Sequence, residues 1–190
     1  MMSRTGAEAI NLYLIGFMGV GKSAVGRGVA RVLKMQFIDS DRAIEETIGT
    51  SIREYFEKEG ESAFRDRERE FIESGHPSHG CVVACGGGLP IASGMIELLR
   101  ARGVVVSLFA GPETILERTK HSDKRPLLNV PDPAGRVEEL LREREAIYMQ
   151  AGPGICTDNR ALQEVILHLA RIYHREAMRF SNSAAGSAER

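Results

Sequence analysis

One eight-residue segment near the N-terminus restricts the possible folds of this chain more than any other feature. Residues 16–23 read GFMGVGKS, which fits the pattern G-x-x-x-x-G-K-[ST] at every position. The segment follows an apolar run, Leu12–Ile15, and precedes a stretch of helical period that extends to about Leu33. Glycines let the backbone turn its N–H groups inward around a phosphate, and the following helix directs its positive end toward the same anion. The segment therefore predicts a phosphate-binding loop between a strand and a helix.

The residues of this loop suit two tasks, binding phosphate and supporting a metal ion. Lys22 is placed to reach the outer phosphates of a nucleoside triphosphate and to act in catalysis, and Ser23 offers a hydroxyl to Mg²⁺. The expected nucleotide contacts are Gly19, Val20, Gly21, Lys22, Ser23 and Ala24. GTPases, ATPases and small-molecule kinases share such a loop, so it indicates a nucleotide but leaves the reaction open. An ordinary glycine-rich turn with an exposed lysine is the alternative interpretation.

The rest of the chain alternates between short apolar runs and longer stretches of helical period. Strands are expected at Leu12–Ile15, Gln36–Asp39, Gly80–Cys85, Val104–Phe109 and Ile155–Thr157. After the first helix, others are expected from Ser51 to about Glu73 with a break near Gly60, from Ser93 to Arg102, from Pro112, from Arg136 to Met149 and from about Arg160 to Tyr173. This alternation predicts an α/β fold, a five-stranded parallel sheet with helices on both faces. We expect one domain over residues 10–176, a flexible arm over 1–9 and a disordered tail over 177–190.

Charge and composition exclude several classes of protein. The 190 residues include 25 Lys and Arg against 26 Asp and Glu, a formal net charge of −1, so no overall positive field attracts nucleic acid or an acidic membrane. No apolar run approaches the roughly 20 residues of a membrane span, and the N-terminus lacks the order of a secretory signal. Cys81 and Cys85 flank strand-like residues, which favours buried thiols over a metal pair. A monomer in a reducing cytoplasm is the expected setting.

Two carboxylates stand where an open α/β sheet places its ligands. Asp39 and Asp41 follow the second expected strand at its carboxyl end. Alternate residues of an extended segment point the same way, so both carboxylates could face one cleft. One could support Mg²⁺ through water while the other accepts hydrogen bonds from a substrate hydroxyl. The alternative for Asp41 is that it caps the next helix.

Further motifs follow these two in a fixed order. They are ESAFR at residues 61–65, three glycines at 86–88 and RPLL at 125–128. In content, order and spacing the series resembles the shikimate kinase family, over roughly residues 11–175. The resemblance implies a three-layer P-loop kinase fold with a mobile lid at about residues 120–135. It also implies Mg²⁺-dependent transfer of the γ-phosphoryl group of ATP to the 3-hydroxyl of shikimate, a step toward chorismate and the aromatic amino acids.

The same resemblance implies roles for individual residues. Asp41 is placed on the substrate hydroxyls, as orienter and candidate base, which leaves Asp39 beside Ser23 for the metal. Arg65 and Arg144 match the arginines that hold the substrate carboxylate, and the paired donors of a guanidinium group fit the two oxygens of an acid. The remaining matches are the backbone of Gly86, Gly87 and Gly88 beside the substrate ring, the catalytic and nucleotide-binding lid residue Arg125, and the nucleotide-side residue Arg118.

The sequence departs from the common family pattern in two places. Several of the matching residues also have less specific interpretations. Leu89 and Pro90 follow the glycines, and Arg160 is followed by alanine where many relatives have adjacent arginines. Arg65 and Arg144 lie among other charged residues, and most such runs are solvated helix faces. The three glycines fit a plain turn as well, and Arg125 fits an ordinary surface loop. A gluconate kinase would share the loop but not the later motifs, and an inactive nucleotide-binding relative would be expected to lose the loop lysine, an aspartate or the lid arginine.

Overall fold

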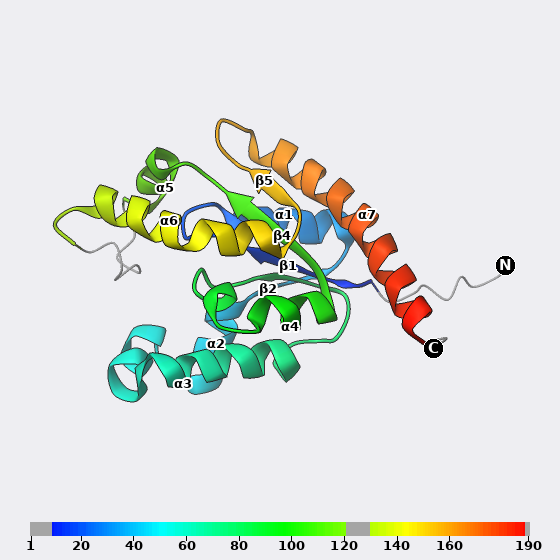
Figure 1. Cartoon of the computed structure of the whole chain (residues 1–190), viewed down its shortest axis with the longest axis horizontal. Helices are drawn as coiled ribbons and strands as arrows, with labels where there is room; N and C mark the ends of the chain where they lie inside the picture. Colours follow the sequence, from blue (N-terminus) through cyan, green and yellow to red (C-terminus); the bar gives the residue numbers. More distant parts are fainter. Residues whose placement is uncertain (1–8, 121–129, 189–190) are drawn as a thin grey trace.

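A five-stranded parallel sheet forms the centre of the molecule (Figure 1). The computed structural model of the chain describes residues 9–120 and 130–188. The strands are β1 Asn11–Ile15, β2 Gln36–Asp39, β3 Cys81–Ala84, β4 Gly103–Phe109 and β5 Gly154–Cys156. Their order across the sheet is β2-β3-β1-β4-β5, and every pair is parallel. The predicted fold class is therefore confirmed.

The helices cover both faces of this sheet. They are α1 Lys22–Leu33, α2 Ser40–Ile48, α3 Ile52–Ser74, α4 Met95–Arg102, α5 Pro112–Thr119, α6 Pro133–Ala151 and α7 Leu162–Ala188, with a 3₁₀ turn, η1, at Leu89–Ile91. Helices α1 and α7 pack against each other behind the sheet, and α4 and α6 lie in front of it and contact β4 (Figure 1). Because both faces are covered, the central strands are mostly apolar, and their few polar residues, such as Ser107, are buried too.

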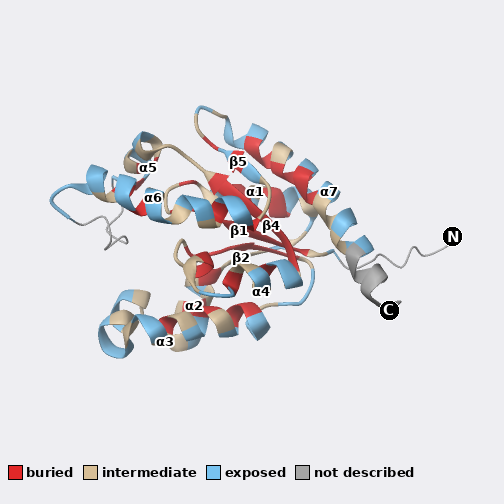
Figure 2. Ribbon diagram, in the orientation of Figure 1, coloured by how far each residue is buried: buried red, intermediate tan, exposed pale blue. Residues whose placement is uncertain are grey.

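Strand β1 lies in the middle of the sheet and of the core (Figure 2). It pairs with β3 on one side, where Leu12 faces Val82, and with β4 on the other, where Leu12 faces Val104. All four residues of the predicted run Leu12–Ile15 are fully buried. Strands β2 and β3 lie on one side of β1, and the later strands β4 and β5 lie on the other. Ligands of open α/β folds bind at the carboxyl ends of the strands beside such a change in strand order. The loops after β1, β2 and β3 are therefore the expected site.

Local sequence signals account for several helix ends. The capping box predicted at Ser51 and Glu54 is present, with the Ser51 side chain accepting from the Glu54 N–H and the Glu54 carboxylate accepting from the Ser51 N–H. The predicted break in α3 occurs at Gly60, which has φ 83° and ψ 171° inside the long helix. Helix α5 begins with Pro112, as expected for a residue that has no N–H to donate.

Other predicted boundaries are wrong. Ser93 does not cap α4, because Gly94 at φ 72° is the N-cap residue. Helix α6 begins at Pro133 and not at Arg136, since the Asp132 side chain accepts from the Gly135 N–H and caps the helix. Helix α2 had no predicted bounds of its own.

The C-terminal helix is much longer than the sequence suggested. It was expected to end near Tyr173, but α7 continues to Ala188. Most of the stretch predicted as a disordered tail is therefore helical. No proline interrupts this part of the chain, and its alanines favour helix.

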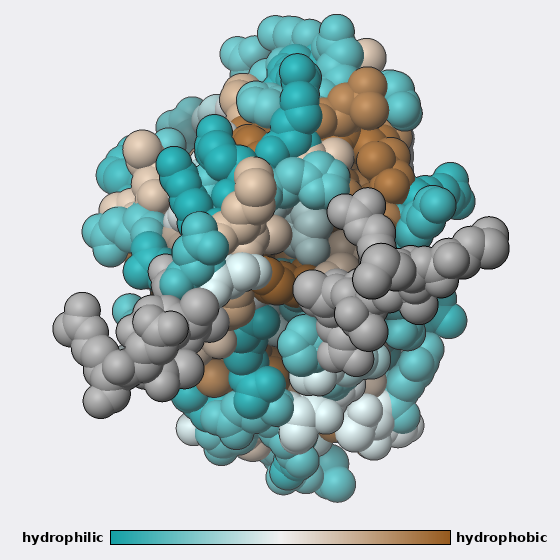
Figure 3. Space-filling view, turned by 90° about the vertical axis from the view of Figure 1, so that its right-hand side faces the viewer, coloured by the Kyte–Doolittle hydropathy of each residue, from teal (hydrophilic) through white to brown (hydrophobic). Residues whose placement is uncertain are grey.

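The molecular surface is mainly polar. Figure 3 shows one face on which hydrophilic residues predominate and apolar residues form a smaller area near one edge. Among the helices of the described residues, none combines the length and apolar character needed to cross a membrane. Cys81 and Cys85 are buried, as predicted.

Candidate active site

The phosphate-binding loop connects β1 to α1 at the carboxyl edge of the sheet. Three glycines in the loop have positive φ angles, 134° at Gly16, 81° at Gly19 and 97° at Gly21. A β-carbon at Gly16 would collide with the backbone carbonyl of Leu108 on the neighbouring strand. Gly21 is the N-cap residue of α1 and has no side chain to cap the helix. The first N–H groups of α1 are therefore available to an anion.

Lys22 lies over this loop. Its Nζ donates to the carbonyl oxygens of Gly16 at 2.8 Å and Phe17 at 2.9 Å. These bonds hold the ammonium group against the first two residues of the loop. A phosphate group bound in the loop would lie beside a fixed positive charge.

Ser23 and Asp39 meet at the base of the loop. The Ser23 Oγ donates to the Asp39 Oδ2 at 2.7 Å. Mg²⁺ prefers oxygen ligands and usually completes its shell with water and the substrate's phosphates. A hydroxyl and a carboxylate beside a phosphate-binding loop fit that requirement. Within the described residues no group of three His, Cys, Asp or Glu side chains is arranged to hold a metal by itself.

Asp41 lies in the first turn of α2 and faces the glycine turn after β3. The N-cap residue of α2 is Asp39, so Asp41 is not the cap of this helix. A β-carbon at Gly86 would collide with the Asp41 Oδ1, which shows that this carboxylate lies directly against the turn. Burial raises the pKa of the Asp41 carboxyl above its usual value, the nearby Asp39 charge raises it further, and Lys22 opposes both. A raised pKa makes a carboxylate a better proton acceptor near neutral pH.

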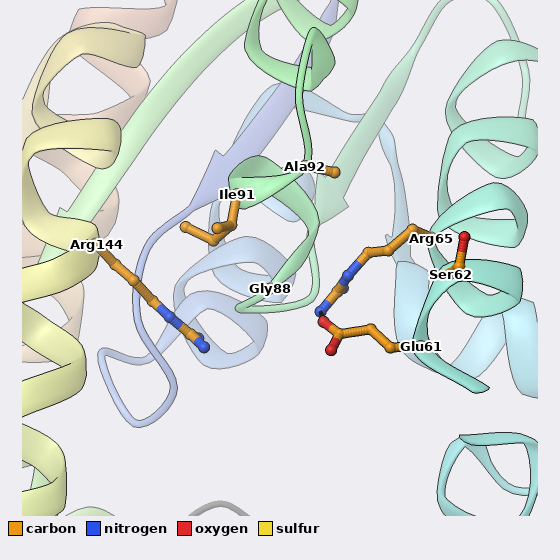
Figure 4. Close-up of a pocket in the computed structure, with 7 residues that line it drawn as sticks. All are labelled: Glu61, Ser62, Arg65, Gly88, Ile91, Ala92 and Arg144. Atoms are coloured by element: carbon orange, nitrogen blue, oxygen red, sulfur yellow. Dashed lines mark hydrogen bonds and ion pairs between the residues drawn. The ribbon is translucent and has the colours of Figure 1, made fainter. Parts of the chain in front are cut away.

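A cavity of about 460 Å³ opens beside this turn. Its lining residues are Glu61, Ser62, Arg65, Gly88, Ile91, Ala92 and Arg144. Arg65 comes from α3 and Arg144 from α6, and their guanidinium groups extend toward each other from opposite sides of the cavity (Figure 4). The structure thus brings together the two arginines that were assigned to a carboxylate.

Arg65 is held by two carboxylates. Its Nη1 donates to Glu68 at 2.5 Å and its Nη2 donates to Glu61 at 2.8 Å. The Glu68 side chain is 1% exposed, and burial raises its pKa to about 7, although Arg65 opposes the rise. Sequence reasoning missed Glu68. Its position three residues after Arg65, on the same helix face, was the available signal.

The glycine turn allows these side chains to approach the backbone. A β-carbon at Gly88 would lie 2.8 Å from both terminal nitrogens of Arg65. The Gly86 N–H donates to the buried Ser40 Oγ at 2.8 Å and so ties the turn to the end of β2. The Tyr148 Oη on α6 donates to the Gly87 carbonyl at 2.8 Å. Leu89 and Pro90, which depart from the family pattern, continue from the turn into η1.

Arg118 lies on the other side of the phosphate-binding loop. Its Nη1 donates to the Thr157 Oγ1 at 2.9 Å and to the Gly19 carbonyl at 3.4 Å. This places it beside the loop, as expected for a nucleotide-side residue. Arg160 donates to the Cys156 carbonyl at 3.3 Å. Arg125 and most of the expected lid lie outside the described residues.

The sequence is similar to those of known shikimate kinases. The family model described as shikimate kinase matches residues 18–173. A shikimate kinase of Paracidovorax citrulli is 44% identical over 85% of this chain and 90% of its own length, and one of Deinococcus radiodurans is 44% identical over 80% and 78%.

Solved structures give a consistent result. The shikimate kinase of Acinetobacter baumannii in complex with shikimate has a TM-score of 0.80 and 35% identity, over 88% of this chain and 94% of that one. A gluconokinase of Sinorhizobium meliloti has a TM-score of 0.59 at 15% identity, which is a similarity of fold alone.

Proposed function

The chain belongs to the shikimate kinase family, and we propose that its own residues bind ATP in the phosphate-binding loop and shikimate in the cavity beside it. The reaction is transfer of the γ-phosphoryl group of ATP to the 3-hydroxyl of shikimate, which yields shikimate 3-phosphate and ADP. The observation that carries the proposal for these sites is the pair of guanidinium groups, Arg65 and Arg144, facing one cavity that borders the same glycine turn as Asp41. An acid held between them would place its ring against the backbone of residues 86–88.

The nucleotide half of the site acts through charge and alignment. The N–H groups of residues 19–24 and the Lys22 ammonium would hold the β- and γ-phosphates, and Arg118 would flank the nucleotide beside Gly19. Ser23 and Asp39 would hold Mg²⁺, which when bound neutralises charge on the phosphates. Arg125 would add positive charge from the lid, which makes it the third proposed catalytic residue with Lys22 and Asp41.

The acceptor half of the site orients a hydroxyl. Asp41 would accept a hydrogen bond from the 3-hydroxyl and take up its proton as the phosphoryl group is transferred. Its carboxylate is close enough to Lys22 for their charges to interact, so the acceptor and the phosphates would meet at this point. Positioning of this kind contributes a large share of the acceleration in phosphoryl transfer.

A turnover assay tests the function. Purified protein with ATP and Mg²⁺ should release ADP rapidly when shikimate is present and only slowly without it. Chelating the metal with EDTA should stop the reaction, because Mg²⁺ held at Ser23 and Asp39 would supply positive charge that these two side chains lack. Phosphoryl transfer to gluconate but not to shikimate would contradict the proposal, and so would ADP release at the same rate with and without shikimate.

The pH dependence of shikimate binding should reflect Glu68. Below a pKa of about 7 this carboxyl is neutral and leaves more of the Arg65 charge to attract an acid; above it the carboxylate compensates Arg65. The KM for shikimate should therefore rise with pH above 7, by at most about tenfold per pH unit. The Glu68→Gln variant, which cannot titrate, should lose this rise. The KM for ATP, measured over the same pH range, is the control. If the shikimate KM depends on pH equally in the unmodified protein and in Glu68→Gln, Glu68 is excluded as the cause.

A further inference from the structure

We propose that Tyr148 is a positioning residue for substrate binding, which holds Arg144 toward the shikimate cavity while leaving its positive charge uncompensated. This proposal rests on the function proposed above. Tyr148 follows Arg144 by one helical turn on α6, so the two side chains lie on the same helix face. The Tyr148 side chain is 1% exposed, whereas α6 is otherwise largely solvated.

The hydrogen bonds of Tyr148 form a directed chain. Its hydroxyl donates to the Gly87 carbonyl at 2.8 Å, and Arg144, one turn earlier on the same helix face, is close enough to oppose the rise that burial causes in the pKa of Tyr148. A phenol has one proton and a guanidinium group has only donors. Because the phenol proton goes to Gly87, the Tyr148 oxygen can act toward Arg144 only as an acceptor. The chain from Arg144 through Tyr148 to Gly87 thus ties the arginine of α6 to the turn that borders the cavity.

Tyr148 itself is anchored to the sheet. Its backbone carbonyl accepts from the Ser107 Oγ at 2.6 Å, and Ser107 is a fully buried residue of β4. Near the end of the same helix, Arg100 donates to the Ala151 carbonyl at 3.0 Å. The position of the phenol is therefore fixed, and it can restrict the orientation of the neighbouring Arg144 side chain.

The two arginines of the cavity are held by partners of different charge. Arg65 lies between the carboxylates of Glu61 and Glu68. Arg144 forms no ion pair with any carboxylate in the described part of the chain, and its partner is a phenol. Burial raises the pKa of Tyr148 to about 12, so this partner is neutral at physiological pH. A neutral acceptor orients a guanidinium group without cancelling its charge.

This difference gives the arginines separate tasks. Arg65 and its two carboxylates, when both are ionised, carry a net negative charge and cannot attract an acid by field alone. The net positive charge that the cavity offers to a carboxylate must then come from Arg144. Tyr148 keeps that charge aimed into the cavity and away from the glutamates that flank Arg144 on the exposed side of α6.

The test is the Tyr148→Phe variant, which removes the hydroxyl and keeps the ring. Its Kd for shikimate, measured by calorimetry, should rise about tenfold, while its KM for ATP stays within about twofold, because the nucleotide half of the site is untouched. Tyr173→Phe is the matched control. Tyr173 is also a buried tyrosine, and its hydroxyl donates to the Ile10 carbonyl at 2.8 Å, far from the cavity. It should lose comparable thermal stability and bind shikimate as the unmodified protein does.

A double-mutant cycle identifies the route of the effect. In an Arg144→Ala background, Tyr148→Phe should change the shikimate Kd by less than about twofold, because the residue that it positions is gone. Additive effects would show that Tyr148 acts through the glycine turn alone and would overturn the proposal. An unchanged Kd in the single variant would overturn it too. Neither result contradicts the proposed function if the unmodified protein phosphorylates shikimate. If the unmodified protein does not phosphorylate shikimate, the proposed function itself is wrong.

Discussion

Replacing Lys22 with alanine should reduce kcat by about 10²–10³-fold, the loss typical of a group that stabilises charge in a transition state. The Lys22 ammonium is held over the phosphate-binding loop by the carbonyls of Gly16 and Phe17, and no other described lysine lies in this loop. During transfer, charge moves across the γ-phosphoryl oxygens, and a fixed cation beside them counters it. The measurement is steady-state ADP release at saturating shikimate and ATP.

The fold should survive this change. Lys22 is partly exposed and lies outside the hydrophobic core. Circular dichroism and thermal unfolding of Lys22→Ala should therefore match those of the unmodified protein. Lys58→Ala, a change at an exposed lysine of α3 paired only with Glu59, is the control and should keep full activity. Full activity in Lys22→Ala would remove the loop from the mechanism.

Replacing Arg144 with alanine should weaken shikimate binding by about 2–4 kcal/mol, as expected for loss of a charge-assisted pair with a carboxylate. The KM for ATP should change little, because the cavity that Arg144 lines includes no residue of the phosphate-binding loop. Binding of each ligand by calorimetry separates the two effects.

Arg144 is a cleaner test than Arg65. Removing Arg65 would leave the buried Glu68 carboxylate without its partner and would mix a stability loss with a binding loss. Arg142→Ala is the matched control, since Arg142 lies two residues earlier on α6 and lines a different cavity. Equal weakening of ATP and shikimate in Arg144→Ala would contradict its role in holding the carboxylate.

Local signals in the sequence predicted most of the fold. The three central strands, β1, β3 and β4, are short runs of mostly buried residues, and all five strands lie within one residue of the expected bounds at both ends. The phosphate-binding loop could be recognised because its function depends on backbone shape, which the spaced glycines Gly16, Gly19 and Gly21 encode. The capping box at Ser51 and the break at Gly60 are likewise decided by neighbours in the chain.

Contacts between distant segments could not be predicted in this way. The run from Arg65 to Glu70 has the composition of a solvated helix face, yet Glu68 is buried because α3 packs against α2 and α4. The bond from Tyr148 to Gly87 joins residues 61 positions apart, and it depends on how α6 packs against β4. Composition describes a helix face, but tertiary packing decides which residues of that face are enclosed.

The order of the strands has a consequence for how such an enzyme can change its acceptor. Gly16, Asp39 and Gly86 lie at the carboxyl ends of β1, β2 and β3, and these strands are adjacent in the order β2-β3-β1. The distances between the strand ends that carry these residues are therefore set by the interstrand repeat, about 4.8 Å, which a point substitution does not change. Binding of a larger or smaller alcohol would therefore require changes in α3 and α6, the helices that line opposite sides of the cavity.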